Sequence, residues 1–187
     1  LLQEGGLAQA TATLNRPLAE VPWLDLVSQL FSISLALVPV LLALYFLKQD
    51  EIDLGLRPKL SDLKQVVLVA AGVGIPGIGL YFLALELGLT ARVIPSALGD
   101  NWWTIPVLLL AAMKAGLLEE VIAVGFFMTK LSKWKPELSI WALIVLSALF
   151  RASYHSYQGF AGIVGNFVMG LIFGWAYRKW GRVMPLI

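Results

Sequence analysis

Apolar residues run along this chain in five stretches of helix length, separated by short polar segments. The stretches cover residues 24–47, 65–89, 104–131, 138–154 and 160–177. An α-helix rises about 1.5 Å per residue, so about 20 apolar residues cross the ~30 Å hydrocarbon core of a bilayer. The pattern predicts an all-α fold, a polytopic membrane helix bundle with five spans. The apolar residues 183–187 indicate a sixth span, truncated at the C-terminus.

The two ends of the chain set the expected domain limits. Residues 1–22 are polar and mixed, with no regular period, and we expect them to be disordered or extended. Residues 23–187 form a single predicted membrane domain, with its core at residues 102–187. Because the chain starts at Leu1 and stops inside an apolar segment, we expect it to be a fragment of a longer protein.

Three features predict interruptions within the spans. Pro39 lies in the middle of the first span, where membrane helices tolerate proline as a kink. The second span holds four glycines and a proline within residues 72–79, so we expect it to bend or to pack closely there. The third stretch, residues 104–131, has 28 residues and would be about 42 Å long as one helix. We therefore expect it to tilt or to break, most naturally at residues 114–116.

Charge separates the two sides of the predicted bundle. The chain is 59% hydrophobic and 14% charged, against about 25% charged in a typical soluble domain, so no soluble domain is expected. The loops after the first, third and fifth spans hold ten of the fourteen basic residues: Lys48, Arg57, Lys59, Lys64, Lys130, Lys133, Lys135, Arg178, Lys179 and Arg182. Only Arg16 and Arg92 lie in the opposite loops. The positive-inside rule then predicts a multi-pass plasma-membrane protein with its N-terminus outside. We expect contact with membrane lipid and none with nucleic acid.

Four ionisable residues fall inside membrane-length apolar sequence. Glu119 and Glu120 lie in the third stretch, while Arg151 and the only histidine, His155, lie in the fourth. A charged group near the bilayer centre costs about 2.5–3.5 kcal/mol, so these four groups need a joint explanation. Two explanations stay open. The four groups can form a polar, water-accessible site between helices, or an ion-pair cluster that only holds helices together. Counting the rise from the start of each stretch puts His155 roughly 10 Å nearer the outer face than Glu119.

These residue types suit a hydrolase that activates water. One carboxylate, kept ionised by a cation, can take a proton from water. Arg151 precedes His155 by four residues, so both project from one helix face, where the guanidinium can hold a carboxylate through two hydrogen bonds. The alternative for Arg151 is a plain interhelical ion pair with Glu120, which would leave Glu119 free.

His155 has more than one open role. It can bind a divalent metal such as zinc together with Glu119, donate a hydrogen bond to an oxyanion, or be a polar residue bonded to its neighbours at the membrane interface. Catalytic zinc usually has three protein ligands, and a chain with one histidine and no cysteine gives only a weak metal signal. Asn166 offers an amide donor from a third helix, or serves as packing glue beside Gly170 and Gly174, a small-xxx-small seam.

Two motifs carry a resemblance to a known family. They are EEVIAVG at residues 119–125 and LFRASYH at residues 149–155, and they resemble the first two motifs of the CPBP family. This family contains the CAAX-protease, bacteriocin-processing and Abi types of intramembrane peptidase. Its pattern is Glu-Glu-x-x-x-Arg-Gly on one helix, Phe-x-x-x-His on the next, and His-x-x-x-Asn or similar on the last core helix. The Leu-Gly-Leu-Arg stretch at residues 54–57 is similar to the loop before the core in bacterial members.

Two positions depart from this pattern. Val124 stands where the family has arginine, and Arg151 stands where it has phenylalanine. The changes are complementary, because a guanidinium lost from one helix reappears on its neighbour and a bond within one helix becomes a bond between two. The sequence SYHSYQG at residues 153–159 is similar to that of an actinobacterial branch. The final motif of the family would lie past Ile187.

The resemblance implies an intramembrane endopeptidase that cleaves a membrane-associated peptide or protein. Glu119 would be the general base, His155 the metal ligand or oxyanion donor, and Glu120 with Arg151 the orienting pair. Whether the attacking water is bound to a metal or activated by glutamate alone stays open. The alternative is a catalytically silent scaffold or regulator of a membrane protein partner, which Val124 favours. A small transporter or channel subunit is a weaker third interpretation, because the spans show no obvious repeat.

Overall fold

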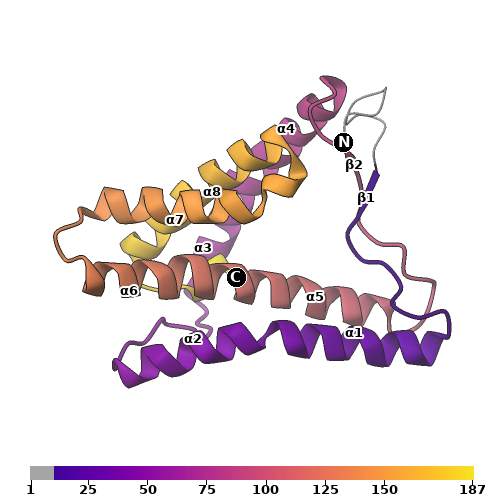
Figure 1. Cartoon of the computed structure of the whole chain (residues 1–187), viewed down its shortest axis with the longest axis horizontal. Helices are drawn as coiled ribbons and strands as arrows, with labels where there is room; N and C mark the ends of the chain where they lie inside the picture. The colour runs from indigo at the N-terminus through magenta and orange to yellow at the C-terminus, as the bar shows by residue number, and fades with distance from the viewer. Residues whose placement is uncertain (1–10) are drawn as a thin grey trace.

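The computed structural model describes residues 11–187, and over this range the fold is all-α, as predicted (Figure 1). The α-helices are α1 (Pro22–Ala36), α2 (Val38–Gln49), α3 (Asp62–Val69), α4 (Ile75–Glu86), α5 (Thr104–Glu119), α6 (Phe127–Trp134), α7 (Ile140–Tyr154) and α8 (Phe160–Trp180). The π-helical turns are η2 (Ala70–Gly74) and η3 (Glu120–Phe126), and the 3-10 turns are η4 (Ser156–Gln158) and η5 (Met184–Leu186). Two short strands, β1 (Thr11–Thr13) and β2 (Arg92–Ile94), pair in parallel.

Helices occupy all five of the predicted stretches. Three of them are long and apolar enough to cross a membrane, namely Pro22–Gln49, Asp62–Glu86 and Phe160–Trp180. Helix α7 is apolar and shorter, with 15 residues. The third stretch runs without a gap through α5, η3 and α6, and it carries the glutamate pair. The protein is therefore a membrane protein built as a helix bundle.

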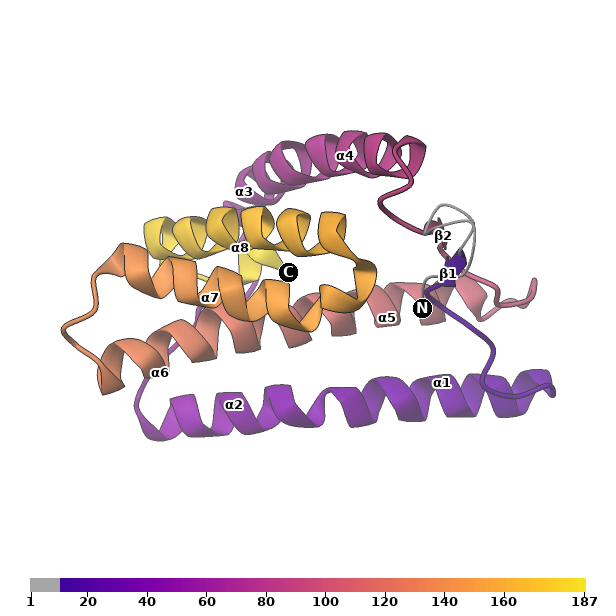
Figure 2. The ribbon, with the colours of Figure 1, turned by 45° about the horizontal axis from the view of Figure 1, so that its top comes forward.

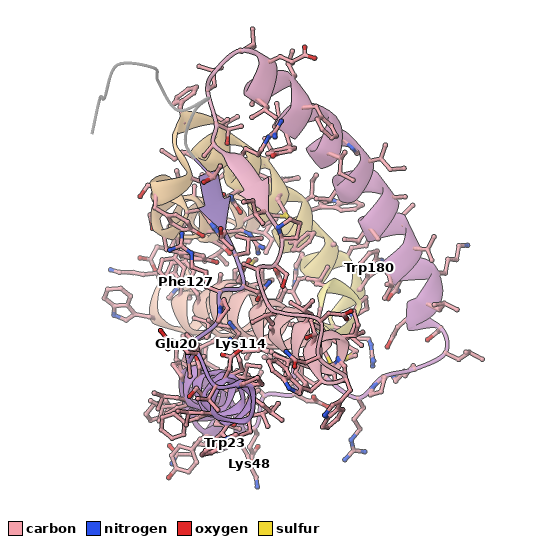
Figure 3. The ribbon with its side chains drawn as sticks, turned by 90° about the vertical axis from the view of Figure 1, so that its right-hand side faces the viewer. Glu20, Trp23, Lys48, Lys114, Phe127 and Trp180 are labelled. Atoms are coloured by element: carbon pink, nitrogen blue, oxygen red, sulfur yellow. The ribbon has the colours of Figure 1, made fainter. Side chains whose placement is uncertain are left out.

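The helices are arranged in layers (Figure 2). The α1–α2 rod lies on one face beside the α5–α6 rod, α7 and α8 lie beyond it, and the α3–α4 rod lies on the far side against α8. Figure 3 looks along the α1–α2 rod, which carries Trp23 near its start and Lys48 near its end. The buried apolar residues form two clusters, one between η3, α6, α7 and α8 and the other between α2, η3 and the C-terminal residues. The predicted site therefore lies on the central layers.

The predicted small-residue seam brings α7 and α8 into close contact. A Cβ atom added at Gly170 would lie 2.7 Å from the Cα of Ala148, and one at Gly174 would lie 3.1 Å from a side-chain methyl of Ile144. Only a residue without a side chain allows the two backbones to approach this closely. The seam is confirmed, and it fixes α8 against the helix that carries Arg151 and His155.

The first two predicted interruptions are present. Between α1 and α2, the Leu37 N–H bonds to the carbonyl of Ser34 at 3.2 Å, a tighter turn just before Pro39. Proline has no N–H and so cannot continue the regular helical ladder. In the α3–α4 rod, the glycine-rich stretch forms the π-helical turn η2, and Pro76 follows it in the first turn of α4.

The third interruption lies elsewhere, and the predicted break at residues 114–116 is wrong. Helix α5 continues unbroken to Glu119, and the irregular turn η3 starts at Glu120. A π-helical turn closes i to i+5 bonds and so holds one more residue than an α-helical turn. Within it, a Cβ atom added at Gly125 would lie 2.6 Å from a methyl of Leu54. The helix changes from α-helical to π-helical geometry at the glutamates, which face α7. It does not change at residues 114–116, where the break was predicted.

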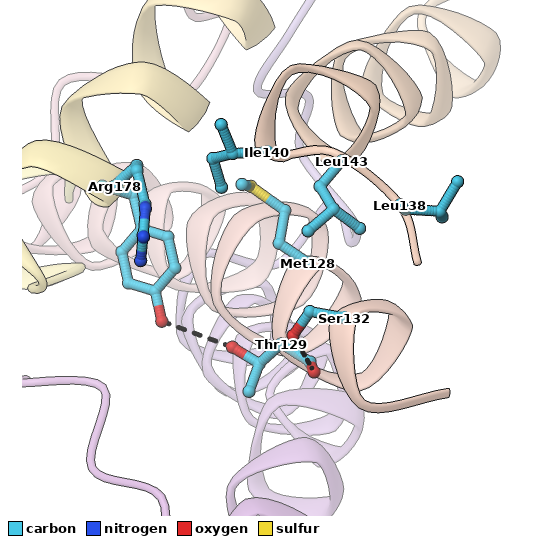
Figure 4. A pocket seen from close by; sticks show the side chains of 8 residues that line it. Met128, Thr129, Ser132, Leu138, Ile140, Leu143 and Arg178 are labelled. Carbon is cyan, nitrogen blue, oxygen red and sulfur yellow. Dashed lines mark hydrogen bonds between the residues drawn. The ribbon is translucent and has the colours of Figure 1, made fainter. Parts of the chain in front are cut away.

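Helices α2 and α6 end at the same side of the molecule, where Asp50 joins them. The Asp50 carboxylate accepts a hydrogen bond from Lys130 at 2.7 Å and lies 3.3 Å from the ammonium of Lys133. The Lys130 hydrogen bond lowers the pKa of Asp50 below its ordinary value. A cavity of about 360 Å³ opens at this end between α6, α7 and α8, with Thr129 and Tyr177 hydrogen-bonded at 3.3 Å (Figure 4). Two of the predicted basic loops therefore share one end of the bundle.

The N-terminal segment is extended where the structure describes it. Strand β1 pairs with β2, with Thr11 opposite Arg92. The Asn15 side chain donates to the carbonyl of Pro95 at 2.7 Å. The backbone carbonyl of Asn15 accepts from the N–H of Ala97 at 2.8 Å. The segment before α1 is thus tied to the loop before α5. Residues 1–10, which belong to the same predicted polar segment, lie outside the described residues.

The last residues pack back into the bundle. The Val183 N–H donates to the carbonyl of Leu54 at 2.8 Å, and Val183 is fully buried. Arg182 bonds the Asp62 carboxylate at 2.9 Å. Residues 184–186, where the sequence indicated the start of a sixth span, form the 3-10 turn η5 instead, with a proline in its first turn.

Candidate active site

The two helices that carry the predicted site form a hairpin. Glu119 lies 15 positions before Trp134, the end of α6, and His155 lies 15 positions after Ile140, the start of α7. At about 1.5 Å per residue, both lie about 22 Å from the shared turn. The predicted 10 Å difference in depth is therefore wrong, because the common turn is the proper origin for the count. The His155 Nε2 atom lies 3.7 Å from the Glu119 Oε2 atom.

Arg151 bonds both glutamates at once. Its Nη1 donates to Glu120 Oε1 at 2.6 Å, and its Nη2 donates to Glu119 Oε2 at 2.5 Å. The guanidinium also lies over the ring of Phe173, 5.1 Å from the ring centroid. The predicted contact between Arg151 and the third stretch is confirmed. The alternative of a plain ion pair between Arg151 and Glu120 would have left Glu119 free, whereas here Glu119 is bound to the same guanidinium.

The two carboxylates differ in exposure. The Glu119 side chain is 25% exposed, while those of Glu120 and Arg151 are 2% and 4% exposed. Three buried polar atoms of the cluster have no hydrogen-bond partner within residues 11–187, namely Glu120 Oε2, Arg151 Nε and His155 Nε2. Buried polar atoms are almost always satisfied, by protein or by water, so these three can take further hydrogen bonds from a polar group in the cluster. Glu119 is the carboxylate that such a group can reach.

A second polar chain runs from α8 to the histidine. Asn166 Nδ2 donates to the carbonyl of Gly162 at 2.9 Å and to Gln158 Oε1 at 3.2 Å. Gln158 Nε2 lies 3.3 Å from His155 Nδ1 and donates to the Tyr157 hydroxyl at 3.1 Å. Asn166 therefore reaches the site through Gln158 rather than directly. Gln158 is not among the residues predicted from the sequence, where its only signal is its place in the turn three residues after the histidine.

A comparison with protein families matches residues 101–187 to the family described as type II CAAX prenyl endopeptidase Rce1-like. The match covers slightly less than half of the chain and includes every residue of the cluster above. The chain is thus similar to the Rce1-like family over residues 101–187. This is a protease family, in agreement with the resemblance to the CPBP peptidases. No curated protein and no solved structure matches the chain.

The segment departs at Val124 from the CPBP motif that it resembles. This residue is buried in the apolar cluster that includes Ile144 and Phe173, so no cation stands at its position. The guanidinium of the site comes from Arg151 on the next helix instead.

Two aromatic rings flank His155, with ring centroids 4.6 Å away at Tyr154 and 6.2 Å away at Tyr157.

The donors that residues 11–187 bring to the site do not by themselves make up a catalytic zinc centre. Such a centre needs three protein ligands about 2.0–2.3 Å from the ion. Within residues 11–187 no group of three or more His, Cys, Asp and Glu residues could hold a metal. The space between the two carboxylates is taken by the Arg151 guanidinium, which is itself a cation. The residues that would hold the expected metal, His155 and Glu119, supply only two ligands.

An apolar cavity of about 580 Å³ adjoins the Rce1-like site. It lies between α4 and α8, beside β1 and β2, and its lining includes Gln158 and Asn166. The glycines of the α3–α4 rod border this space: within the described chain, no atom beyond the neighbouring residues and backbone of their own helix lies within 4 Å of a Cβ added at Gly72 or Gly77. The expected close packing of this glycine-rich stretch is therefore absent from the described chain, and the glycines widen the cavity.

Proposed function

We propose that the protein is an intramembrane endopeptidase in which Glu119 activates water. The observation that carries this proposal is the arrangement at Glu119. It is the accessible carboxylate of the cluster, it is oriented by the buried Arg151, and it lies 3.7 Å from a histidine nitrogen that has no other partner within residues 11–187. A structural ion pair would need none of this accessibility.

The reaction follows from the positions of these groups. Glu119 takes a proton from water, and the hydroxide oxygen attacks the carbonyl carbon of the scissile peptide bond. His155 donates a hydrogen bond toward the water or the oxyanion. When the carbon–nitrogen bond breaks, Glu119 returns the proton to the leaving nitrogen. Arg151 holds Glu119 in place, and Glu120 accepts a hydrogen bond from the other terminal nitrogen of the guanidinium and so fixes its orientation. No step needs a metal.

The substrate is a peptide or protein that is itself associated with the membrane. The cavity between α4 and α8 is lined mainly by apolar residues and ends at the polar chain of Gln158 and Asn166, so it suits the apolar part of a substrate beside the reacting bond. The family name favours a prenylated CAAX-type C-terminus as the first substrate to test. A lipid-anchored substrate would reach the site from the bilayer.

The proposed location is the plasma membrane, with the N-terminus outside. The split of basic residues supports this orientation, because ten of fourteen lie in the three loops expected in the cytoplasm. In this orientation the turn between α6 and α7 is cytoplasmic, and Glu119 and His155 lie about 22 Å from it along their helices.

The second candidate is a catalytically silent regulator or scaffold for a membrane protein. One observation favours it: Arg151 engages both carboxylates, which is also what an ion-pair cluster with a purely structural role would do. The two candidates differ in what happens when the base is removed and the size of its side chain is kept.

Glu119→Gln makes that distinction. It keeps the size and one hydrogen-bond acceptor of the side chain but removes the base, so cleavage of a prenylated CAAX reporter peptide should fall by about 10²- to 10⁴-fold. Glu137→Gln, at an exposed residue outside the cluster, is the matched control and should keep full activity. Folding is checked by helical circular dichroism and size exclusion in detergent. A folded Glu119→Gln protein with undiminished cleavage would exclude the proposed mechanism.

A further inference from the structure

The polar chain behind His155 determines which nitrogen of its ring carries the proton. At the far end of this chain the Gly162 carbonyl can only accept a hydrogen bond. Asn166 faces it at 2.9 Å, so the atom there must be the amide nitrogen. The same NH₂ group then donates its second hydrogen to Gln158 at 3.2 Å. The atom that Gln158 presents to Asn166 must therefore be its oxygen.

This orientation leaves the NH₂ group of Gln158 facing the histidine. Gln158 Nε2 has only hydrogens to offer, and it lies 3.3 Å from His155 Nδ1 and 3.1 Å from the Tyr157 hydroxyl. His155 Nδ1 must accept and so carries no proton. A neutral imidazole has one N–H, which is then on Nε2. A fixed backbone carbonyl thus sets, through two amides, the protonation pattern of the ring.

We propose that Gln158 is a positioning residue that holds His155 in the form protonated at Nε2, with this N–H on the side of Glu119. The Nε2 atom is buried, has no hydrogen-bond partner within residues 11–187, and lies 3.7 Å from Glu119 Oε2. It is a donor beside the carboxylate that activates water. A protonated nitrogen has no lone pair for a metal, so His155 acts on the water or the oxyanion as a donor. This role in catalysis rests on the proposed function, whereas the protonation pattern does not.

The chain suits a direct test, because it contains a single histidine. Full-length protein with a purification tag free of histidine is labelled with ¹⁵N-histidine and studied in detergent micelles at mildly alkaline pH. Long-range ¹H–¹⁵N spectra distinguish Nδ1 from Nε2 and report which is protonated. Wild-type protein should show an unprotonated Nδ1 and a protonated Nε2.

Gln158→Glu reverses the polarity at the ring. The carboxylate that replaces the NH₂ group is an acceptor, so Nδ1 should gain a proton. Gln49→Glu adds the same charge at an exposed position at the end of α2 and should leave the spectrum unchanged. If Gln158→Glu does not fold, Gln158→Leu is the second variant, and the single wild-type pattern should then give way to a mixture of the two neutral forms.

Cleavage measured on the same samples keeps the two proposals apart. Gln158→Glu should lower kcat by about 10²-fold or more with little change in KM, since a histidine in the wrong protonation pattern cannot supply its hydrogen bond. A protonated Nδ1 in the wild type, or a spectrum unchanged in Gln158→Glu, overturns the positioning role even if Glu119→Gln abolishes cleavage. The expected spectra with full activity in Gln158→Glu overturn its role in catalysis.

Discussion

Arg151→Met tests whether the ion-pair cluster carries stability as well as orientation. Methionine keeps a flexible apolar side chain near Phe173 but removes the cation. It leaves Glu120, which is 2% exposed, without its only recorded hydrogen-bond partner in the described chain. Removing one partner of a buried pair costs about 3–5 kcal/mol, because the remaining charge is left buried and uncompensated. Glu119 loses the same partner but is partly exposed, so most of the cost arises at Glu120.

The second half of the test is a double-mutant cycle. Glu120→Gln in the Arg151→Met background removes the stranded charge, so the double variant should regain about 2 kcal/mol or more relative to Arg151→Met alone. The free energy of unfolding is measured by denaturant titration in detergent micelles. Arg178→Met, at an exposed arginine of α8, is the control and should change stability by no more than about 0.5 kcal/mol. Additive effects of the two substitutions would refute the reasoning.

Gly170→Ala should lower the free energy of unfolding by about 1–3 kcal/mol, because the new methyl would meet the backbone of α7 at 2.7 Å. Gly165→Ala is the control and should be tolerated, because its new methyl would have its nearest neighbour at 3.7 Å. Equal stability of these two variants in thermal unfolding would contradict the seam. Because its pKa is lowered, the Asp50 carboxylate stabilises the fold above the ordinary aspartate pKa, and this stability is lost as the pH falls through the lowered value. Wild type and Asp50→Asn should thus differ in melting temperature at neutral pH and converge in acid, and a constant difference would argue against the linkage. Cysteines placed singly at Ser61 and Ala97 test orientation: an impermeant thiol reagent on intact cells should label position 97 and spare position 61, and the reverse would mean an inverted topology.

Most of the helix bundle could be predicted because its signals are local. Long apolar stretches and a proline at position 39 act through the backbone of their own helix, and two glycines four residues apart mark a helix face for close contact whatever its neighbour is. The contact between Arg151 and the glutamates was also predictable, since a buried cation and buried carboxylates on neighbouring helices have few other partners.

The remaining features depend on contacts between segments far apart in sequence. The pairing of β1 with β2 joins residues about 80 positions apart, and nothing in either three-residue segment marks it as a strand. The π-helical turn at Glu120 forms among neighbours from other elements, including Leu54 against Gly125. Gln158 gains its role only because the turn η4 folds back toward α8 and brings it to Asn166. Tertiary packing decides each of these features.

The hairpin of α5, α6 and α7 also bears on how the protein enters the bilayer. Glu120 and Arg151 are 31 positions apart, and each alone would cost about 2.5–3.5 kcal/mol at the centre of the membrane. At a synthesis rate of about 5–20 residues per second, the arginine follows the glutamates by roughly 2–6 seconds. During that interval the carboxylates lack the arginine that bonds both of them in the folded hairpin. We therefore expect the α5–α6 rod to gain its full stability in the membrane only when α7 joins it, so that the rod and α7 enter as one unit that carries its own counter-charge.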